Sequence, residues 1–388
     1  MNRITTLLLA GMLLASCGNN NHKGNTGTQS AAVENTNADA PMPVNSYRRF
    51  SGTIAGQPVV MHLVEMDNGS FMGNYYYVKQ GRSIDVYVVK DSTGTNNYTV
   101  EEQVGKGDVA NAHWNATITN GAIKGKWLSA DGKKTYDIDL KTELPAGSMP
   151  LEVYSDRDSL ALFPGKKGTP SADISFTLLL PAEDANKEDA AFVKTTLLNV
   201  LGCDSMHETD IKSCIKRSIQ EYAGSYRSDA GELYDSTSEN ASLNYYSASV
   251  FNVIFNEDGW LVLQNTSSSY EGGAHGNYGS SYLNLDLVNK KEWKLEDIMT
   301  VDSAALSALL ETEARSLFNI PAKQKLGESL LVDKIDANGN VYVTNTGITF
   351  HYVPYEIAAY AFGESDLFIP YSKLSNLLKP EFKKRMKL

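Results

Sequence analysis

The strongest constraint on the fold is a turn signal that recurs in the first part of the chain. Asn68-Gly69, Asn120-Gly121 and Asp131-Gly132 each lie between two alternating apolar runs. Such dipeptides are the strongest short-range indication of a β-hairpin, because type I′ turns need positive φ at both central residues. The strand-like segments of this region are residues 47–55, 59–66, 70–77, 83–90, 97–103, 113–119, 122–128 and 133–140. Residues 46–143 are therefore predicted to be an all-β meander that closes into a small barrel or sandwich and so hides its edges.

Aromatic side chains in this β-region allow two interpretations. Tyr75 and Tyr77, together with Trp114 and Trp127, could form a stacking platform for a sugar or a peptide. They could also be core residues and cross-strand pairs of an ordinary sheet, which is the interpretation that we favour. His62 lies in strand-like sequence without spaced partners and is predicted to be structural.

The second region, residues 149–388, mixes both kinds of periodicity. Strand-like segments are predicted at residues 151–163, 172–180, 244–255, 260–269 and 281–288. Helical spacing covers residues 187–201, a segment that begins at Thr209, and residues 302–318. Because the strands cluster apart from the helices, we predict an α+β domain with an antiparallel sheet.

The first 45 residues indicate where the protein is located rather than how it folds. Residues 1–17 combine a cationic start, a short apolar run and small residues before Cys17, which is typical of a secretory signal. The run Leu14-Ala15-Ser16-Cys17 resembles the bacterial lipobox, and that resemblance implies cleavage before Cys17 and acylation of its thiol and amine. Several acyl chains on Cys17 would hold the protein on a membrane. Residues 18–45 have little to bury and are predicted to be a disordered tether.

Charge and cysteine content restrict the class of partner and the redox compartment. The formal net charge is −11 with a pI near 5.1, and no basic patch is present, which argues against nucleic acid as a partner. With Cys17 acylated, Cys203 and Cys214 are the remaining thiols, and an oxidising compartment favours a disulfide between them. Two buried free thiols, or a metal pair with His207, are the alternatives.

A glycine-rich stretch dominates the second region. Residues 269–278 read Ser-Tyr-Glu-Gly-Gly-Ala-His-Gly-Asn-Tyr, and apolar strand-like segments lie on both sides. Glycine lets the backbone adopt positive φ and pass close to another surface, and binding residues tend to lie on loops held by strands. The stretch is therefore either a structural loop or a ligand-binding loop centred on His275.

Four motifs in order carry a family resemblance. They are Tyr270–Asn277, Leu283–Leu287, Trp293–Ile298 and the run from Phe350 through Tyr355-Glu356 to Gly363. Across most of residues 170–385 the chain resembles the extracellular domain of the anti-sigma factor RsiV and the similar module appended to PdaC-type peptidoglycan deacetylases. The RsiV domain is known as a lysozyme receptor, so the resemblance implies a binding module that works at the cell wall.

The candidate ligand-binding residues share the loop or the last motif. They are Tyr270, Glu271, His275, Asn277, Tyr355 and Glu356. No Gly-x-Ser-x-Gly elbow, His-Glu-x-x-His motif or phosphate-binding glycine loop is present, so no cofactor, catalytic residue or metal ligand is predicted. A metal site at His275, His351 and Glu356 is chemically conceivable but has no supporting spacing.

Taken together, these features predict a non-catalytic protein, lipid-anchored in the cell envelope, that binds a lysozyme-like protein or a cell-wall ligand. The anchor would lie at the outer membrane, on its periplasmic face or at the cell surface. The alternative is a hydrolase acting on peptidoglycan or another glycan, in which His275 is the general base and Glu271 or Glu356 orients it.

Overall fold

The structure is a computed structural model. It describes residues 37–92, 94, 96–104, 110–203, 207–238, 240–301 and 303–388. The predicted signal sequence with Cys17, and residues 18–36 of the predicted tether, lie outside the described residues.

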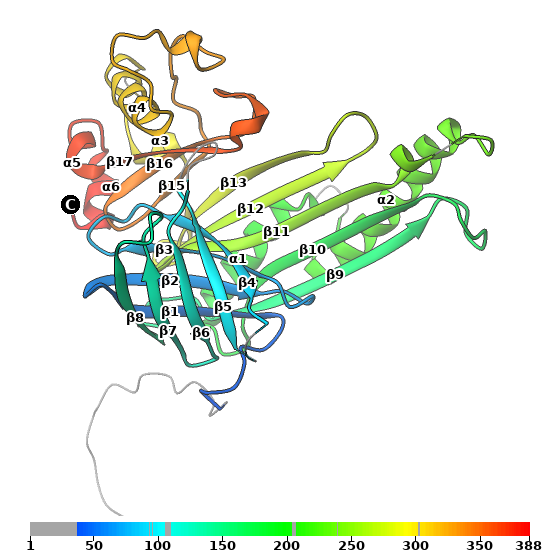
Figure 1. Cartoon of the computed structure of the whole chain (residues 1–388), viewed down its shortest axis with the longest axis horizontal. Helices are drawn as coiled ribbons and strands as arrows, with labels where there is room; N and C mark the ends of the chain where they lie inside the picture. Colours follow the sequence, from blue (N-terminus) through cyan, green and yellow to red (C-terminus); the bar gives the residue numbers. More distant parts are fainter. Residues whose placement is uncertain are drawn as a thin grey trace, which may run out of the picture. The chain divides into compact units, whose positions relative to one another are not determined.

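The first folded region is a closed barrel of eight antiparallel strands (Figure 1). The strands are β1 (Ser46–Ile54), β2 (Gln57–Glu65), β3 (Phe71–Tyr77), β4 (Ile84–Lys90), β5 (Asn97–Gln103), β6 (His113–Ile118), β7 (Ala122–Leu128) and β8 (Thr135–Thr142). Each strand pairs with its neighbours in sequence, and β1 closes the barrel by pairing with β8. The predicted all-β meander is confirmed, in its barrel form.

The hairpins form as predicted, but their turns differ from the predicted type. Positive φ at both central residues occurs at Ala55-Gly56, with φ of 53° and 73°. In the connections that contain Asn68-Gly69 and Asp131-Gly132, only the glycine has positive φ, at 76° and 68° respectively. These connections are longer than two residues, so a type I′ turn is not required for the strands to pair.

The end of the predicted tether lies against this barrel. Met42 is 3% exposed and belongs to the barrel core. The backbone amides of Asn120 and Gly121 donate to the carbonyls of Ala40 and Ala38, each at 2.9 Å. Folded structure therefore begins before residue 46.

The second region is built on a six-stranded sheet in the order β14-β13-β12-β11-β10-β9 (Figure 1). Its strands are β9 (Leu151–Ala161), β10 (Ser171–Pro181), β11 (Tyr245–Glu257), β12 (Trp260–Tyr270), β13 (Asn277–Asp286) and β14 (Lys291–Glu292). The predicted sheet with separate helices is confirmed. One pair, β10 with β11, is parallel, because two helices carry the chain back between them.

Those two helices are α1 (Lys187–Val200) and α2 (Ile211–Leu233). The side chains of Asn186 and Asp210 accept backbone N–H bonds at the two helix starts, which satisfies donors that no helical partner reaches. A disulfide joins Cys203, which follows α1, to Cys214 on α2, with 5.6 Å between their Cα atoms. Closing so short a loop contributes about 3 kcal/mol in the chain-entropy treatment.

A smaller, three-stranded sheet completes this region, in the order β15-β16-β17. The remaining elements are β15 (Val341–Val343), β16 (Gly347–Tyr352), β17 (Ser365–Pro370), α3 (Leu295–Ile298), α4 (Ser303–Leu317), α5 (Tyr371–Leu374), α6 (Pro380–Met386) and the short 3₁₀ helices η2 (Ala241–Leu243), η3 (Leu326–Glu328) and η4 (Tyr360–Phe362). Trp260 and Trp293, each 1% exposed, pack with Phe382 in the core of this part.

The barrel and the large sheet are joined by a buried polar contact. Arg49 on β1 is 4% exposed and forms an ion pair with Glu257 at the end of β11. Asn74 on β3 donates to the carbonyl of Val253 at 2.7 Å. The barrel and the second region accordingly form a single compact unit. Within the described residues, no helix has the length and apolar character that a membrane crossing requires.

Candidate functional site

The predicted binding loop connects β12 to β13. The last residues that oppose each other on these strands are Ser269 and Asn277. Gly272 and Gly273 have φ of 88° and 100°, a region that other residues rarely adopt, which explains the two glycines at this point. The loop is exposed, and its exposed residues include His275.

His275 lies in a cluster of aromatic rings at the tip of this hairpin. Its ring centroid is 4.4 Å from that of Tyr360 and 6.4 Å from that of Tyr355. The Tyr355 hydroxyl is 3.4 Å from Nε2 of His275, and Tyr278 packs edge-on against Tyr360 at 5.6 Å. We name the four residues His275, Tyr278, Tyr355 and Tyr360 the tip cluster. Tyr355 is 55% exposed, so the cluster presents aromatic surface to solvent.

The turn that follows β16 brings Tyr355 to the hairpin. Tyr355 has a φ of 71°, and its amide donates to the carbonyl of Ala358 at 3.0 Å. Glu356 holds this turn, because its carboxylate accepts from the Val353 amide at 3.0 Å and from the Asn338 side chain at 2.7 Å. A left-handed conformation at a tyrosine is strained, and such strain is found mostly at functional positions.

Only some of the predicted ligand-binding residues come together. His275 and Tyr355 come together, whereas the Glu356 carboxylate is engaged within its own turn. Tyr270 stacks on Tyr246 at 6.3 Å and donates to the carbonyl of Gly273. Glu271 instead lies near Tyr245. Burial is the main cause that raises the pKa of the Tyr245 phenol, and the Glu271 carboxylate is among the nearby charges that raise it further.

Two residues of the tip cluster, Tyr278 and Tyr360, were missed from the sequence, although they lie beside or inside the quoted motifs. Tyr278 ends the glycine-rich stretch, and Tyr360 belongs to the last motif. Their aromatic character in an otherwise polar loop was the available signal. Asn277 is exposed at the start of β13, beside the cluster in sequence.

A second group of polar side chains surrounds His351 on β16. The ring is 2% exposed; Nδ1 lies 2.6 Å from Asp366 and Nε2 lies 3.3 Å from Glu364. Burial alone would lower the pKa of His351, but the neighbouring carboxylates of Asp366 and Glu364 outweigh it and raise that pKa to about 10. His351 is therefore a cation at neutral pH and is not available as a proton acceptor.

This group borders a cavity of about 470 Å³ that Arg82, Gln103, Tyr282 and Asn319 also line. The nitrogens of His351 face Asp366 and Glu364, rather than the partners of the metal site considered above. Among the residues that the structure describes, no group of three or more His, Cys, Asp or Glu side chains is arranged to hold a metal ion.

Comparisons with known proteins show what part of the chain is similar to. Residues 296–372 match the family described as "Protein of unknown function (DUF3298)". The chain is similar to a crystal structure of a DUF3298 family member from Bacteroides fragilis, with 26% identity over 62% of this chain and 98% of that chain and a TM-score of 0.55. A DUF3298 family protein from Pseudomonas aeruginosa is 19% identical over 60% of this chain and 96% of that chain, with a TM-score of 0.45. No curated protein matches the chain.

Proposed function

We propose that this chain is a non-catalytic binding protein, anchored in the cell envelope through an acylated Cys17, and that the tip cluster is its recognition surface. The observation that carries the proposal is the meeting of four rings at the β12–β13 hairpin, where His275 and Tyr355 are exposed and His275 lies against Tyr355 and Tyr360. Rigid aromatic side chains supply large contact area at little cost in conformational entropy, and they are enriched where proteins bind one another.

The resemblance to the RsiV domain gives this surface a ligand class. Its motifs contain His275, Tyr355 and Tyr360, and Tyr278 directly follows the first motif. A lysozyme-like protein is strongly basic, and the formal charge of −11 on this chain complements it. A cell-wall fragment is the second ligand class, since aromatic side chains also bind sugar rings and peptides.

The hydrolase alternative has less support from the geometry. A histidine general base needs a group that orients it. His275 bonds to the carbonyl of Gly276 and to Tyr355, and among the described residues no carboxylate is hydrogen-bonded to it. We therefore do not assign a catalytic role to His275.

The test is a binding titration of the full chain, purified in detergent, against a basic muramidase of the lysozyme type and against soluble muropeptides. Replacing His275 or Tyr355 by Ala should weaken binding at least about tenfold, and binding should weaken as salt is added. Tyr87→Ala is the matched control, because Tyr87 is 59% exposed on β4 and lies outside the tip cluster.

The anchor is tested on the same protein in cells, where Cys17→Ser should move it from the membrane fraction to the soluble fraction. If neither probe binds, or if both tip variants bind as well as the unaltered chain, the recognition proposal is wrong.

A further inference from the structure

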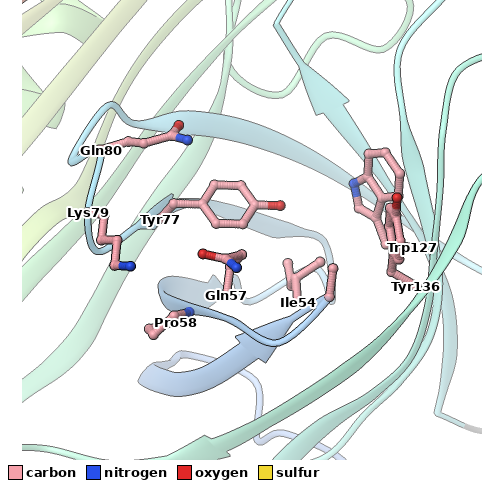
Figure 2. Close-up of a pocket in the computed structure, with 9 residues that line it drawn as sticks. Ile54, Gln57, Pro58, Tyr77, Lys79, Gln80, Trp127 and Tyr136 are labelled. Carbon is pink, nitrogen blue, oxygen red and sulfur yellow. The ribbon is translucent and has the colours of Figure 1, made fainter.

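One end of the barrel has a concave surface, which is formed by residues remote in sequence from the tip cluster. A pocket of about 450 Å³ opens where the β1–β2 turn, the end of β3 and the β7–β8 hairpin meet (Figure 2). The residues that matter for its chemistry are Ile54, Gln57, Tyr77, Gln80, Trp127 and Tyr136. In Figure 2 the Tyr77 hydroxyl points toward the Trp127–Tyr136 pair, with Gln57 and Ile54 beneath.

The barrel interior below this pocket is full. Phe50, Met61, Leu63 and Val100 are all 0% exposed, and they belong to one continuous core. An eight-stranded barrel is just wide enough for side chains to fill it, and here they do. A ligand at this end must therefore lie across the mouth, so the pocket suits a compact ring rather than a long apolar tail.

The aromatic rings at the mouth are held in place from below. The Glu102 carboxylate is 5% exposed, and its Oε1 accepts from the Tyr75 hydroxyl at 2.6 Å, Trp114 Nε1 at 3.0 Å and Trp127 Nε1 at 2.6 Å. Trp127 stacks on Tyr136 with 5.5 Å between ring centroids and 30° between their planes.

The opposite side of the mouth is also supported, because Tyr77 packs edge-on against Tyr75 at 5.7 Å. Tyr75 thereby connects Tyr77 to the same buried carboxylate, Glu102, that orients Trp127. Rings held this way lose little conformational freedom when a ligand binds, which is the property of a preorganised site.

We propose that this mouth binds a saccharide. An aromatic face accepts the C–H face of a pyranose ring, and the carboxamides of Gln57 and Gln80 offer both donors and acceptors to neighbouring hydroxyls. Lys79 lines the same mouth, and its ammonium group opposes a cationic ligand while it tolerates a neutral or acidic sugar. This site is independent of the tip cluster and adds a second binding activity to the proposed function.

The experiment is calorimetric titration of the full chain with three uncharged probes: the β-1,4-linked trimers of N-acetylglucosamine and of glucose, and the α-1,4-linked glucose trimer. At least one probe should bind with a dissociation constant in the micromolar to millimolar range. Tyr136→Ala should weaken that binding at least about tenfold. Tyr136 is 41% exposed, so its truncation leaves the barrel folded, which a thermal melt verifies.

Two further variants make the assignment specific. Tyr87→Ala, on the outer wall of the same barrel, should leave saccharide binding unchanged. Glu102→Gln keeps the shape of the buried side chain but removes its charge, and it should weaken binding while the near-ultraviolet circular dichroism of the tryptophans changes.

Absence of binding to all three probes, or binding that Tyr136→Ala leaves intact, would overturn the saccharide proposal. Either result leaves the muramidase test untouched, because that test depends on Tyr355 and His275 rather than on Tyr136. Conversely, loss of muramidase binding in the Tyr355 variant says nothing against a saccharide at the mouth.

Discussion

The barrel and the large sheet differ in the sequence separation between their paired strands. Every barrel pairing except β1 with β8 joins consecutive strands, so short hairpins account for most of its structure. In the large sheet, β10 reaches β11 only after α1, the disulfide and α2 have intervened. Closing long loops is entropically expensive and slow, so the second region depends more on packing between distant segments.

The comparison also extends to one buried histidine in each region. His62 on β2 is 0% exposed. Its burial lowers its pKa well below the usual value, and the nearby charge of Arg49 lowers it further. His351 on β16 is nearly as buried, yet its two carboxylate neighbours raise its pKa to about 10. Similar burial thus yields a neutral ring in the barrel and a charged ring in the second region, so the neighbouring charges decide the outcome.

The largest expected effect comes from breaking the contact that joins the two regions. Glu257→Ala leaves the Arg49 guanidinium buried without its carboxylate, which should cost about 3–5 kcal/mol in the free energy of unfolding. Urea unfolding followed by tryptophan fluorescence measures it. Asp137→Ala, which breaks the exposed pair with Lys126, should change stability little. Equal losses in the two variants would contradict the interpretation of a buried connecting ion pair.

The two histidines should affect the pH dependence of stability in opposite ways, one giving an acid limb and the other an alkaline limb. Below about pH 6.5, the unfolded chain takes up a proton at His62 that the folded chain excludes, so stability should fall as the pH falls. From about pH 6.5 to about 10, the unfolded chain releases a proton that folded His351 keeps, so stability should fall as the pH rises. The slope from one such group is at most about 1.4 kcal/mol per pH unit.

Thermal melts across this range measure the two limbs. His351→Asn should flatten the alkaline limb and leave the acid limb in place, and His62→Asn should do the reverse. Profiles that run parallel in all three proteins would show that other groups control the pH dependence.

The smallest effect compares one turn in each region. Gly56 and Gly259 are the second residues of two-residue hairpin turns, with φ of 73° and 75°. Alanine at either position adds left-handed strain of about 1–2 kcal/mol. A Cβ at Gly56 meets nothing within 4 Å, whereas one at Gly259 would lie 2.6 Å from Cγ2 of Val288. Urea unfolding should therefore give a somewhat larger loss for Gly259→Ala, and the reverse order would contradict the packing argument.

The sequence predicted the barrel well because its signals are local. The alternating runs placed all eight strands to within about two residues, and only the two-residue turn at Ala55-Gly56 lacked its usual dipeptide. It could not predict the parallel pairing of β10 with β11, since periodicity does not say which strands are neighbours. For the site, the motifs contained His275 and Tyr355, but the meeting of Tyr360 with His275 depends on a turn that the pattern does not specify.

The His351 group was missed for a related reason. His351 and Asp366 are directly opposed on β16 and β17, and this register follows from the pairing of the two strands rather than from either segment alone. Nothing in the sequence of either segment shows how the two strands align. Glu364 then comes within 3.3 Å of His351 because it precedes β17.

The contact between the β3–β4 turn and the β15–β16 turn has a consequence for how such chains can evolve. Asn345 and Thr346 donate to the carbonyls of Val78 and Gln80 at 2.9 and 2.6 Å, and Gly81 leaves room for the approach. Both donors lie inside the segment that matches the family, whereas both acceptors belong to the barrel. Recombination that moved this segment beside a different neighbour would remove both hydrogen bonds, so the new neighbour would have to supply acceptors or leave these two side chains to water.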